Sequence, residues 1–234
     1  YTNRLSEEYF TRMEQFNQEY LRTLQAQNYE ALSEDGKIDY VLFRNYLEEA
    51  LAVLDLDRRD FEQIKSVLAF GKPLEDFVVA RRRAKQPDSQ ALAASWNQVA
   101  KAVDAQLKAL PAVSKYTSWQ TADLAASAVE SLNRVTKEAY DFYYDYDPSF
   151  TWWMPEPWKK LDASMKAYAK ALREHYTNSV KDDGSGIIGK PIGREALEKQ
   201  LGFEMIAYSP EELIAEAEKQ FAWCEKEMLK ASNE

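Results

Sequence analysis

The fold class of this chain is decided by residues 118–144, which read SWQTADLAASAVESLNRVTKEAYDFYY. Apolar residues recur here at alternating steps of four and three, at Ala128, Leu132, Val135, Ala139 and Phe142. Because an α-helix has about 3.6 residues per turn, these side chains share one face. The spacing therefore predicts a long helix that buries this face in a core.

The distribution of glycine extends this prediction along the chain. No glycine lies between Gly71 and Gly184, and this stretch holds no Asn-Gly or Asp-Gly pair that would favour a β-hairpin. We predict an all-α fold, an array of about seven or eight helices with long antiparallel pairs. The helices are expected over residues 6–32, 38–70, 74–85, 88–110, 118–144, 156–180, 194–201 and 210–231. Residues 185–192 fit either a short extended segment or a tight loop.

Two later helices repeat the apolar pattern, and each is expected to bury its stripe. The stripe of residues 156–180 consists of Trp158, Leu161, Met165, Tyr168, Leu172 and Tyr176. That of residues 210–231 consists of Ile214, Ala217, Phe221, Cys224 and Met228. We interpret the chain as a single helical region, 1–234, with a possible subdivision into 1–110 and 115–234.

Helix boundaries are marked by capping residues and prolines. Ser209 followed by Pro210 and by Glu212 predicts a capping box, and Thr117 with Gln120 predicts a second one. Prolines inside helices are costly, so Pro87, Pro111 and the pair Pro155/Pro157 are expected to separate successive helices.

Composition excludes several classes of protein. The formal net charge of -9 argues against a nucleic-acid partner, because binding phosphates requires clustered Lys and Arg. The short basic cluster Arg81–Arg83 with Lys85 is interpreted as a solvated helix end. No stretch approaches the roughly 18 to 20 apolar residues of a membrane span. The single cysteine, Cys224, excludes an internal disulfide.

No residue is predicted to be catalytic or to bind a metal. The one histidine, His175, stands in no zinc-binding spacing and is expected to be partly exposed near a helix end. Cys224 is expected to fill an apolar stripe. A pair of carboxylates such as Asp145 and Glu156 does not stand out among 39 acidic residues. The segment Gly189–Leu197 lacks the Gly-Lys-Ser/Thr ending of a phosphate loop.

The segment from Tyr140 to Trp158 is unusually rich in aromatic residues around an aspartate-rich turn. Aromatic side chains offer flat apolar faces with polar edges, which can hold a peptide or a sugar in a groove. The candidate substrate-lining residues are Tyr144, Trp152, Trp153 and Trp158. The alternative is that these rings pack one part of a larger protein against another.

Three stretches together resemble the DUF885 family, a domain family of unknown function. They are Phe150-Thr151-Trp152-Trp153 with Pro155 and Pro157, then residues 189–197 (GKPIGREAL), then residues 204–214 (EMIAYSPEELI) leading to Glu218 and residues 221–228 (FAWCEKEM). The resemblance implies a mostly helical protein that is similar to zincin-type zinc metallopeptidases. It also implies a location outside the cytoplasm, as a periplasmic protein, a lipoprotein or a secreted protein. It covers the N-terminal part of that family. The chain therefore reads as a piece of a longer protein.

The zinc helix of that family, with its His-Glu-x-x-Pro-Gly-His pattern, does not occur in this sequence. The resemblance thus implies that zinc is bound by a missing C-terminal part or chain, which would be the partner of this region, with a peptide as substrate. We therefore expect the N-terminal region of a zinc-metallopeptidase-like hydrolase, forming one wall of a substrate cleft. The alternative is a stand-alone, non-catalytic helical binding or scaffold module.

Overall fold

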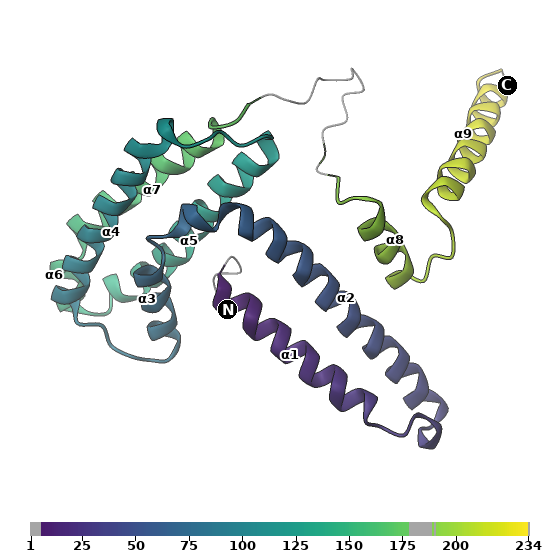
Figure 1. The fold of residues 1–234 in the computed structure, drawn as a ribbon, viewed down its shortest axis with the longest axis horizontal. Helices are drawn as coiled ribbons and strands as arrows, with labels where there is room; N and C mark the ends of the chain where they lie inside the picture. Colours follow the sequence, from purple (N-terminus) through teal and green to yellow (C-terminus); the bar gives the residue numbers. More distant parts are fainter. Residues whose placement is uncertain (1–5, 178–188, 190, 234) are drawn as a thin grey trace. The chain divides into compact units, whose positions relative to one another are not determined.

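The computed structural model describes residues 6–177, 189 and 191–233. Over these residues it contains nine α-helices and no β-strand, which confirms the predicted all-α class (Figure 1). In the segment expected to be extended or looped, 185–192, residues 185–188 and 190 lie outside the described residues, and residues 189, 191 and 192 belong to no helix or strand. The helices are α1 Glu7–Gln25, α2 Glu34–Ile64, α3 Lys72–Arg82, α4 Ser89–Ala109, α5 Trp119–Tyr144, α6 Pro148–Trp153, α7 Pro155–Arg173, α8 Arg194–Phe203 and α9 Pro210–Asn233.

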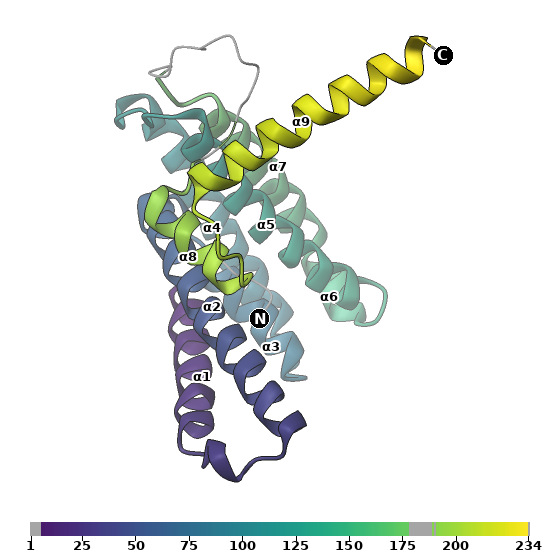
Figure 2. The ribbon, with the colours of Figure 1, turned by 90° about the vertical axis from the view of Figure 1, so that its right-hand side faces the viewer.

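The chain divides into two compact units, each assembled from two stretches of sequence. The first unit is Tyr1–Phe16 with Leu54–Gly186, and the second is Asn17–Val53 with Ile187–Glu234. The antiparallel helices α1 and α2 contribute residues to both units (Figures 1 and 2). Ring contacts join these two helices inside each unit. Phe10 and Phe61 lie 5.3 Å apart in the first unit, and Tyr20 and Phe43 lie 6.4 Å apart in the second.

The core of the first unit is built around α5, which packs against α3, α6 and α7, while α4 packs against α7. Small side chains on α5 allow its neighbours to come close. The fully buried alanines are Ala122, Ala125, Ala126, Ala128 and Ala139. Larger side chains from the surrounding helices fill the remaining space, among them Leu74, Trp96, Leu161, Met165 and Leu172. This bundle gives the end of α5 a rigid support.

The second unit contains α8 and α9 in addition to parts of α1 and α2. The side-chain amide of Asn45 on α2 donates to the backbone oxygen of Phe203 at 2.8 Å. Arg194 at the start of α8 pairs with Glu211 at the start of α9 at 2.5 Å. None of the described helices of the chain is both long and apolar enough to cross a membrane.

The predicted helix boundaries are partly confirmed. Ser209 Oγ accepts from the backbone N–H of Glu212 at 3.2 Å, and the Glu212 carboxylate accepts from the backbone N–H of Ser209 at 2.8 Å, which is the expected capping box. The N-cap residue of α5 is Ser118, one residue after the predicted Thr117, and Ser118 Oγ accepts from the backbone N–H of Thr121 at 3.3 Å. Pro155 and Pro157 lie in the first turn of α7, where a helix needs no backbone donor, and so mark the boundary between α6 and α7.

Three expectations about buried stripes are wrong. Phe142 is 52% exposed, whereas its neighbours Tyr140 and Tyr143 in the last turn of α5 are buried, so the core-facing side of the helix there is not the one that carries Phe142. Tyr176 is only half-buried, since α7 ends at Arg173 instead of continuing to residue 180. The stripe of α9 is exposed along its length, with Cys224 exposed as well. The short helix α6 was not expected at all.

Candidate functional site

The aromatic segment forms a corner in which α5 ends, α6 makes a short turn and α7 begins. Asp147 caps α6, accepting from the backbone N–H groups of Ser149 at 2.9 Å and Phe150 at 3.2 Å. The side-chain amide of Gln86 also donates to Asp147, at 3.1 Å. These bonds favour the ionised carboxylate, so the pKa of Asp147 lies below its usual value, with Gln86 the largest cause.

The hydroxyl of Thr151 also holds the corner together, through hydrogen bonds to backbone oxygens. Thr151 Oγ1 donates to the backbone oxygen of Tyr144 and lies 3.0 Å from that of Asp147. The last turn of α5 is thereby tied to the middle of α6. The backbone that carries the exposed rings is held on both sides by hydrogen bonds.

Part of the aromatic set faces inward and anchors the corner. Phe150 and Met154 are fully buried, and Tyr140 and Tyr143 are nearly so. The ring of Phe150 lies 5.3 Å from Tyr143 and 5.5 Å from Tyr140. Burial raises the pKa of Tyr140 to about 12, with smaller contributions from Tyr144 and Asp141. The rings of Tyr140, Tyr143 and Phe150 belong to the core of the first unit.

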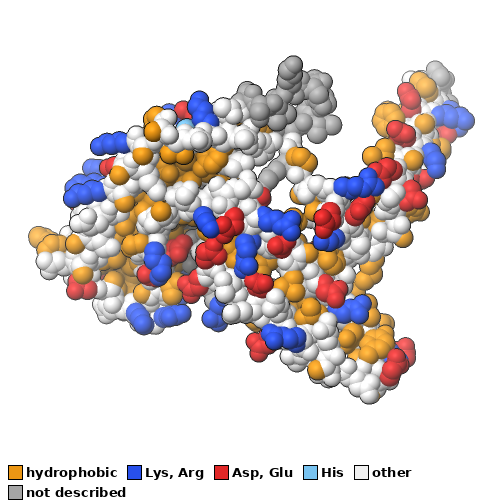
Figure 3. Space-filling model, viewed as in Figure 1, with side chains coloured by type: hydrophobic (Ala, Val, Ile, Leu, Met, Phe, Trp, Pro, Cys, Tyr) orange, Lys and Arg blue, Asp and Glu red, His pale blue; other side chains and the backbone are white. Residues whose placement is uncertain are grey.

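The other part of the aromatic set faces outward. Trp152 is 81% exposed and Tyr146 is 75% exposed, while Trp153 and Tyr144 are less so. In the space-filling view, hydrophobic side chains reach the surface on the left, where α6 lies (Figure 3). A shallow depression of about 440 Å³ lies among these residues. It is lined by Tyr144, Asp145, Tyr146, Pro148, Thr151 and Trp152.

The four candidate residues are therefore placed differently. Tyr144 and Trp152 line the depression together. Trp153 is exposed beside it without lining it. Trp158 points into the bundle, where its ring stacks on Tyr140 at 5.2 Å and lies 5.7 Å from Trp96. Trp158 therefore packs on the core side of the corner and is not part of its exposed surface.

Sequence analysis missed Tyr146 and Pro148 as members of this surface. The signal was present, because Asp147-Pro148 is a cap followed by a proline at the first helical position. A helix start there would have separated Tyr144 and Tyr146 from the rings of α6. It would also have shown that Phe150 and Trp152, two residues apart, point to different sides of the helix.

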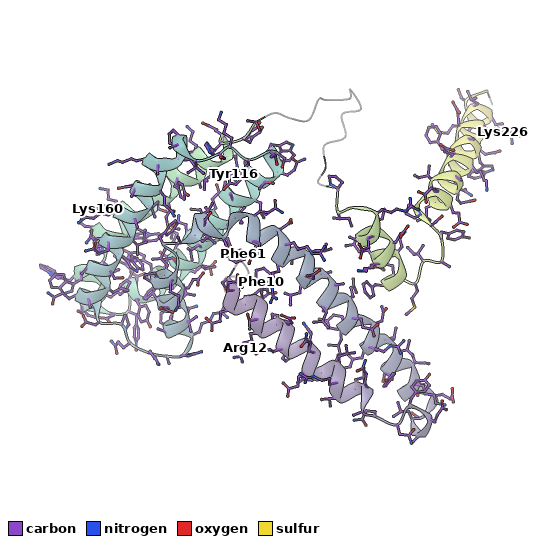
Figure 4. The ribbon with its side chains drawn as sticks, in the orientation of Figure 1. Phe10, Arg12, Phe61, Tyr116, Lys160 and Lys226 are labelled. Carbon is purple, nitrogen blue, oxygen red and sulfur yellow. The ribbon has the colours of Figure 1, made fainter. Side chains whose placement is uncertain are left out.

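A second cavity, of about 200 Å³, lies between the start of α1 and helices α3 and α5. Its apolar lining includes Val78, Leu132 and Val135, and its charged rim includes Arg82 and Arg12, the latter labelled on α1 in Figure 4. Arg81, which precedes Arg82 in the basic cluster, does not line this cavity. Its guanidinium lies 5.2 Å from the centre of the Phe142 ring. This cavity is separate from the aromatic corner, as the two share no lining residue.

His175 has a structural role. It is buried, and not partly exposed as expected, because it lies just after α7 and its Nε2 is 3.1 Å from the backbone oxygen of Val113. The backbone oxygen of His175 also accepts from the N–H of Tyr116. The histidine thus joins the end of α7 to the connection between α4 and α5. Among the described residues, no group of three or more His, Cys, Asp or Glu side chains is arranged to hold a metal ion.

The chain was compared with known families, proteins and structures. A family model described as "Bacterial protein of unknown function (DUF885)" matches residues 1–234. No curated protein and no solved structure matches the chain. Because the family model covers the chain from Tyr1 to Glu234, the chain belongs to the DUF885 family.

Proposed function

We propose that this chain is the substrate-contacting helical region of a zinc-metallopeptidase-like hydrolase, with the aromatic corner as one wall of a peptide cleft. The observation that carries the proposal is the division of the aromatic segment into buried and exposed rings. The buried rings account for the stability of the corner. The exposed rings of Trp152, Tyr144 and Tyr146 contribute little to the core and are available to a ligand.

The chemistry of the exposed rings suits a peptide. Exposing a large apolar side chain forgoes about 1.5–3 kcal/mol that burial would supply, so Trp152 gains when a ligand covers it. Tyrosine and tryptophan combine apolar faces with a hydrogen-bonding edge, and both are frequent in the central contacts of binding surfaces. Asp145 adds a carboxylate to the lining, which can accept from peptide N–H groups.

The support is rigid, which favours binding. The bonds of Asp147 and Thr151 fix the backbone of the corner before a ligand arrives. Little conformational entropy is then lost when the rings are covered. A preorganised aromatic wall is therefore a better binding surface than the same rings on a loose loop.

The hydrolase part of the proposal is supported by the three sequence stretches that resemble DUF885 and by membership of that family. Under it, the zinc ion and its histidine ligands belong to a part of the protein other than these 234 residues. The same likeness supports a location outside the cytoplasm.

The test is a comparison of two tryptophan variants. Binding of a degenerate mixture of short peptides is measured by calorimetry for the unmodified chain, for Trp152→Ala and for Trp119→Ala. Trp119 is a matched control, because it is 41% exposed at the other end of α5. We expect the Trp152 variant to bind at least about tenfold more weakly, a loss of about 1.4 kcal/mol, and the Trp119 variant to be unchanged.

Zinc separates the proposal from its alternative. The native protein is assayed for zinc content and for hydrolysis of the peptides that bind. Metal near one equivalent with zinc-dependent cleavage supports the hydrolase. Peptide binding without zinc or cleavage would instead favour a non-catalytic binding module. Equal peptide affinities of the two tryptophan variants would show that the aromatic corner does not bind the peptide under either proposal.

A further inference from the structure

Helix α9 carries an apolar stripe that the described residues leave uncovered. Its members follow one another at alternating steps of three and four, and they are Ile214, Ala217, Phe221, Cys224 and Met228. Phe221 and Met228 are each 73% exposed. This spacing is that of the a and d positions of a coiled coil, so the five side chains form one seam along the helix.

The seam is long enough to hold another helix. At a rise of about 1.5 Å per residue, residues 214 to 228 extend over roughly 21 Å, or about four turns. No proline or glycine interrupts this stretch. The side chains of a facing helix can pack into the spaces between the side chains of such an uninterrupted seam.

The acidic and basic residues of α9 lie at different positions relative to the seam. The positions that flank it on one side carry Glu218 and Glu225, and Glu227 lies on the other side. The lysines occupy the opposite face, where Lys219 pairs with Glu216 at 3.3 Å and Lys230 with Glu227 at 2.5 Å. Lys226, labelled in Figure 4, lies on that face as well. One border of the apolar seam is therefore acidic, with Glu218 and Glu225, whereas the other carries Leu213, Gln220 and the paired Glu227.

We propose that the seam of α9 is a docking face for a basic amphipathic helix, one whose apolar stripe is bordered by Lys or Arg and which lies outside these 234 residues. Oppositely charged residues beside a coiled-coil seam select the partner and fix its orientation. Glu218 and Glu225 on the acidic border supply one half of such pairs, and the partner supplies the other. This inference does not depend on the hydrolase proposal.

The same charges disfavour two other occupants. An antiparallel second copy of α9 would bring like charges together, because Glu218 and Glu225 lie on the same border and would face their counterparts. A lipid surface that is anionic attracts helices with Lys and Arg beside their apolar face, which is the reverse of α9.

The test uses two synthetic helical peptides and two protein variants. Both peptides have leucine at every a and d position, and the border positions are lysine in one peptide and glutamate in the other. The protein variants are Ala217→Asp, which places a charge in the seam, and Ala215→Asp, which places the same charge on the opposite face of α9. Both alanines are exposed, so neither change disturbs a core. Circular dichroism verifies that both variants remain helical.

Fluorescence anisotropy of the labelled peptides gives the affinities. We expect the lysine peptide to bind at least tenfold more tightly than the glutamate peptide, and its affinity to fall as salt is added. Ala217→Asp should weaken its binding at least tenfold and Ala215→Asp less than twofold. Equal affinities for the two peptides, or equal effects of the two variants, would overturn the proposal. Concentration-dependent dimers in sedimentation that are lost in Ala217→Asp alone would also overturn it, by assigning the seam to a second copy.

Discussion

Helices α7 and α9 carry the same kind of apolar pattern and differ in what covers it. In α7 the stripe is buried, with Leu161, Met165 and Leu172 fully inaccessible. In α9 the corresponding residues are exposed, with Phe221 and Met228 mostly accessible. The period of a sequence therefore predicts which residues share a face, whereas burial depends on whether another element packs on that face. In the first unit, α4 and α5 provide that element for α7.

The largest expected effect compares two methionines, one on each helix. Met165→Ala removes a fully buried side chain and leaves a cavity, so it should lower the free energy of unfolding by about 2–5 kcal/mol. Met228→Ala removes a side chain that is 73% exposed and should change the stability by less than about 0.5 kcal/mol. Urea denaturation measures both values. Similar losses would mean that the α9 stripe is already covered in solution.

Two glycines differ in the same way, because Gly71 is closely packed in the first unit and Gly202 in α8 is not. A Cβ at Gly71 would lie 3.0 Å from both Leu132 Cδ2 and the backbone oxygen of Leu68, because α3 begins close against α5. Gly71→Ala should therefore destabilise the first unit by about 1–3 kcal/mol. Gly202→Ala in α8 meets nothing within 4 Å and should stabilise its helix by up to about 1 kcal/mol. Thermal unfolding followed by circular dichroism distinguishes the two signs, and a neutral Gly71→Ala would show that α3 moves freely away from α5.

A smaller effect concerns the cap that shapes the corner. Asp147→Ala removes two hydrogen bonds to the start of α6 and should cost about 0.5–2 kcal/mol at pH 7. Since the folded pKa of Asp147 is below the usual pKa of an aspartate, the stabilisation is fully present above that usual pKa and is lost as the pH falls through the folded pKa. The variant and the unmodified chain should therefore converge in stability at strongly acidic pH. A constant difference across the acid range would contradict a charged cap.

The smallest effect concerns a surface ion-pair network of the first unit. Arg173 at the end of α7 lies 2.8 Å from Asp123 and 2.9 Å from Glu130, both on α5. All three side chains are close to half exposed, so solvent screens their attraction. Arg173→Met should cost at most about 1 kcal/mol, and the cost should shrink in high salt. A large, salt-independent loss in urea denaturation would show that this network is part of the core.

The sequence was sufficient to predict the longer helices and the inward face of α7, because both follow from local periodicity and capping residues, although the expected end of α7 was too late by seven residues. The burial of His175 was not predictable, since it depends on a contact with Val113, 62 residues away. Phe142 was assigned to the core by its spacing, but in the last turn of α5 the buried side chains are Tyr140 and Tyr143, while Phe142 is exposed. Helix α6 was missed because six residues are too few to show a period.

The candidate site was partly predictable for the same reason. The density of aromatic residues located the corner correctly in the sequence. It did not distinguish Trp152, which is exposed, from Trp158, which lies on the core side of the corner. That distinction depends on where α6 and α7 begin, and so on the cap at Asp147 and the turn at Met154.

The most direct measurement is a nuclear magnetic resonance titration of the indole N–H groups with a mixture of short peptides. The six tryptophans report on different places: Trp152, Trp153 and Trp158 on the corner, Trp96 on the core, Trp119 on the far end of α5 and Trp223 on α9. The account predicts that the resonances of Trp152 and Trp153 shift with peptide while those of Trp96 and Trp119 stay in place. Unchanged Trp152 and Trp153 resonances, or shifts confined to Trp119 or Trp223, would contradict the assignment of the aromatic corner as a peptide-binding surface.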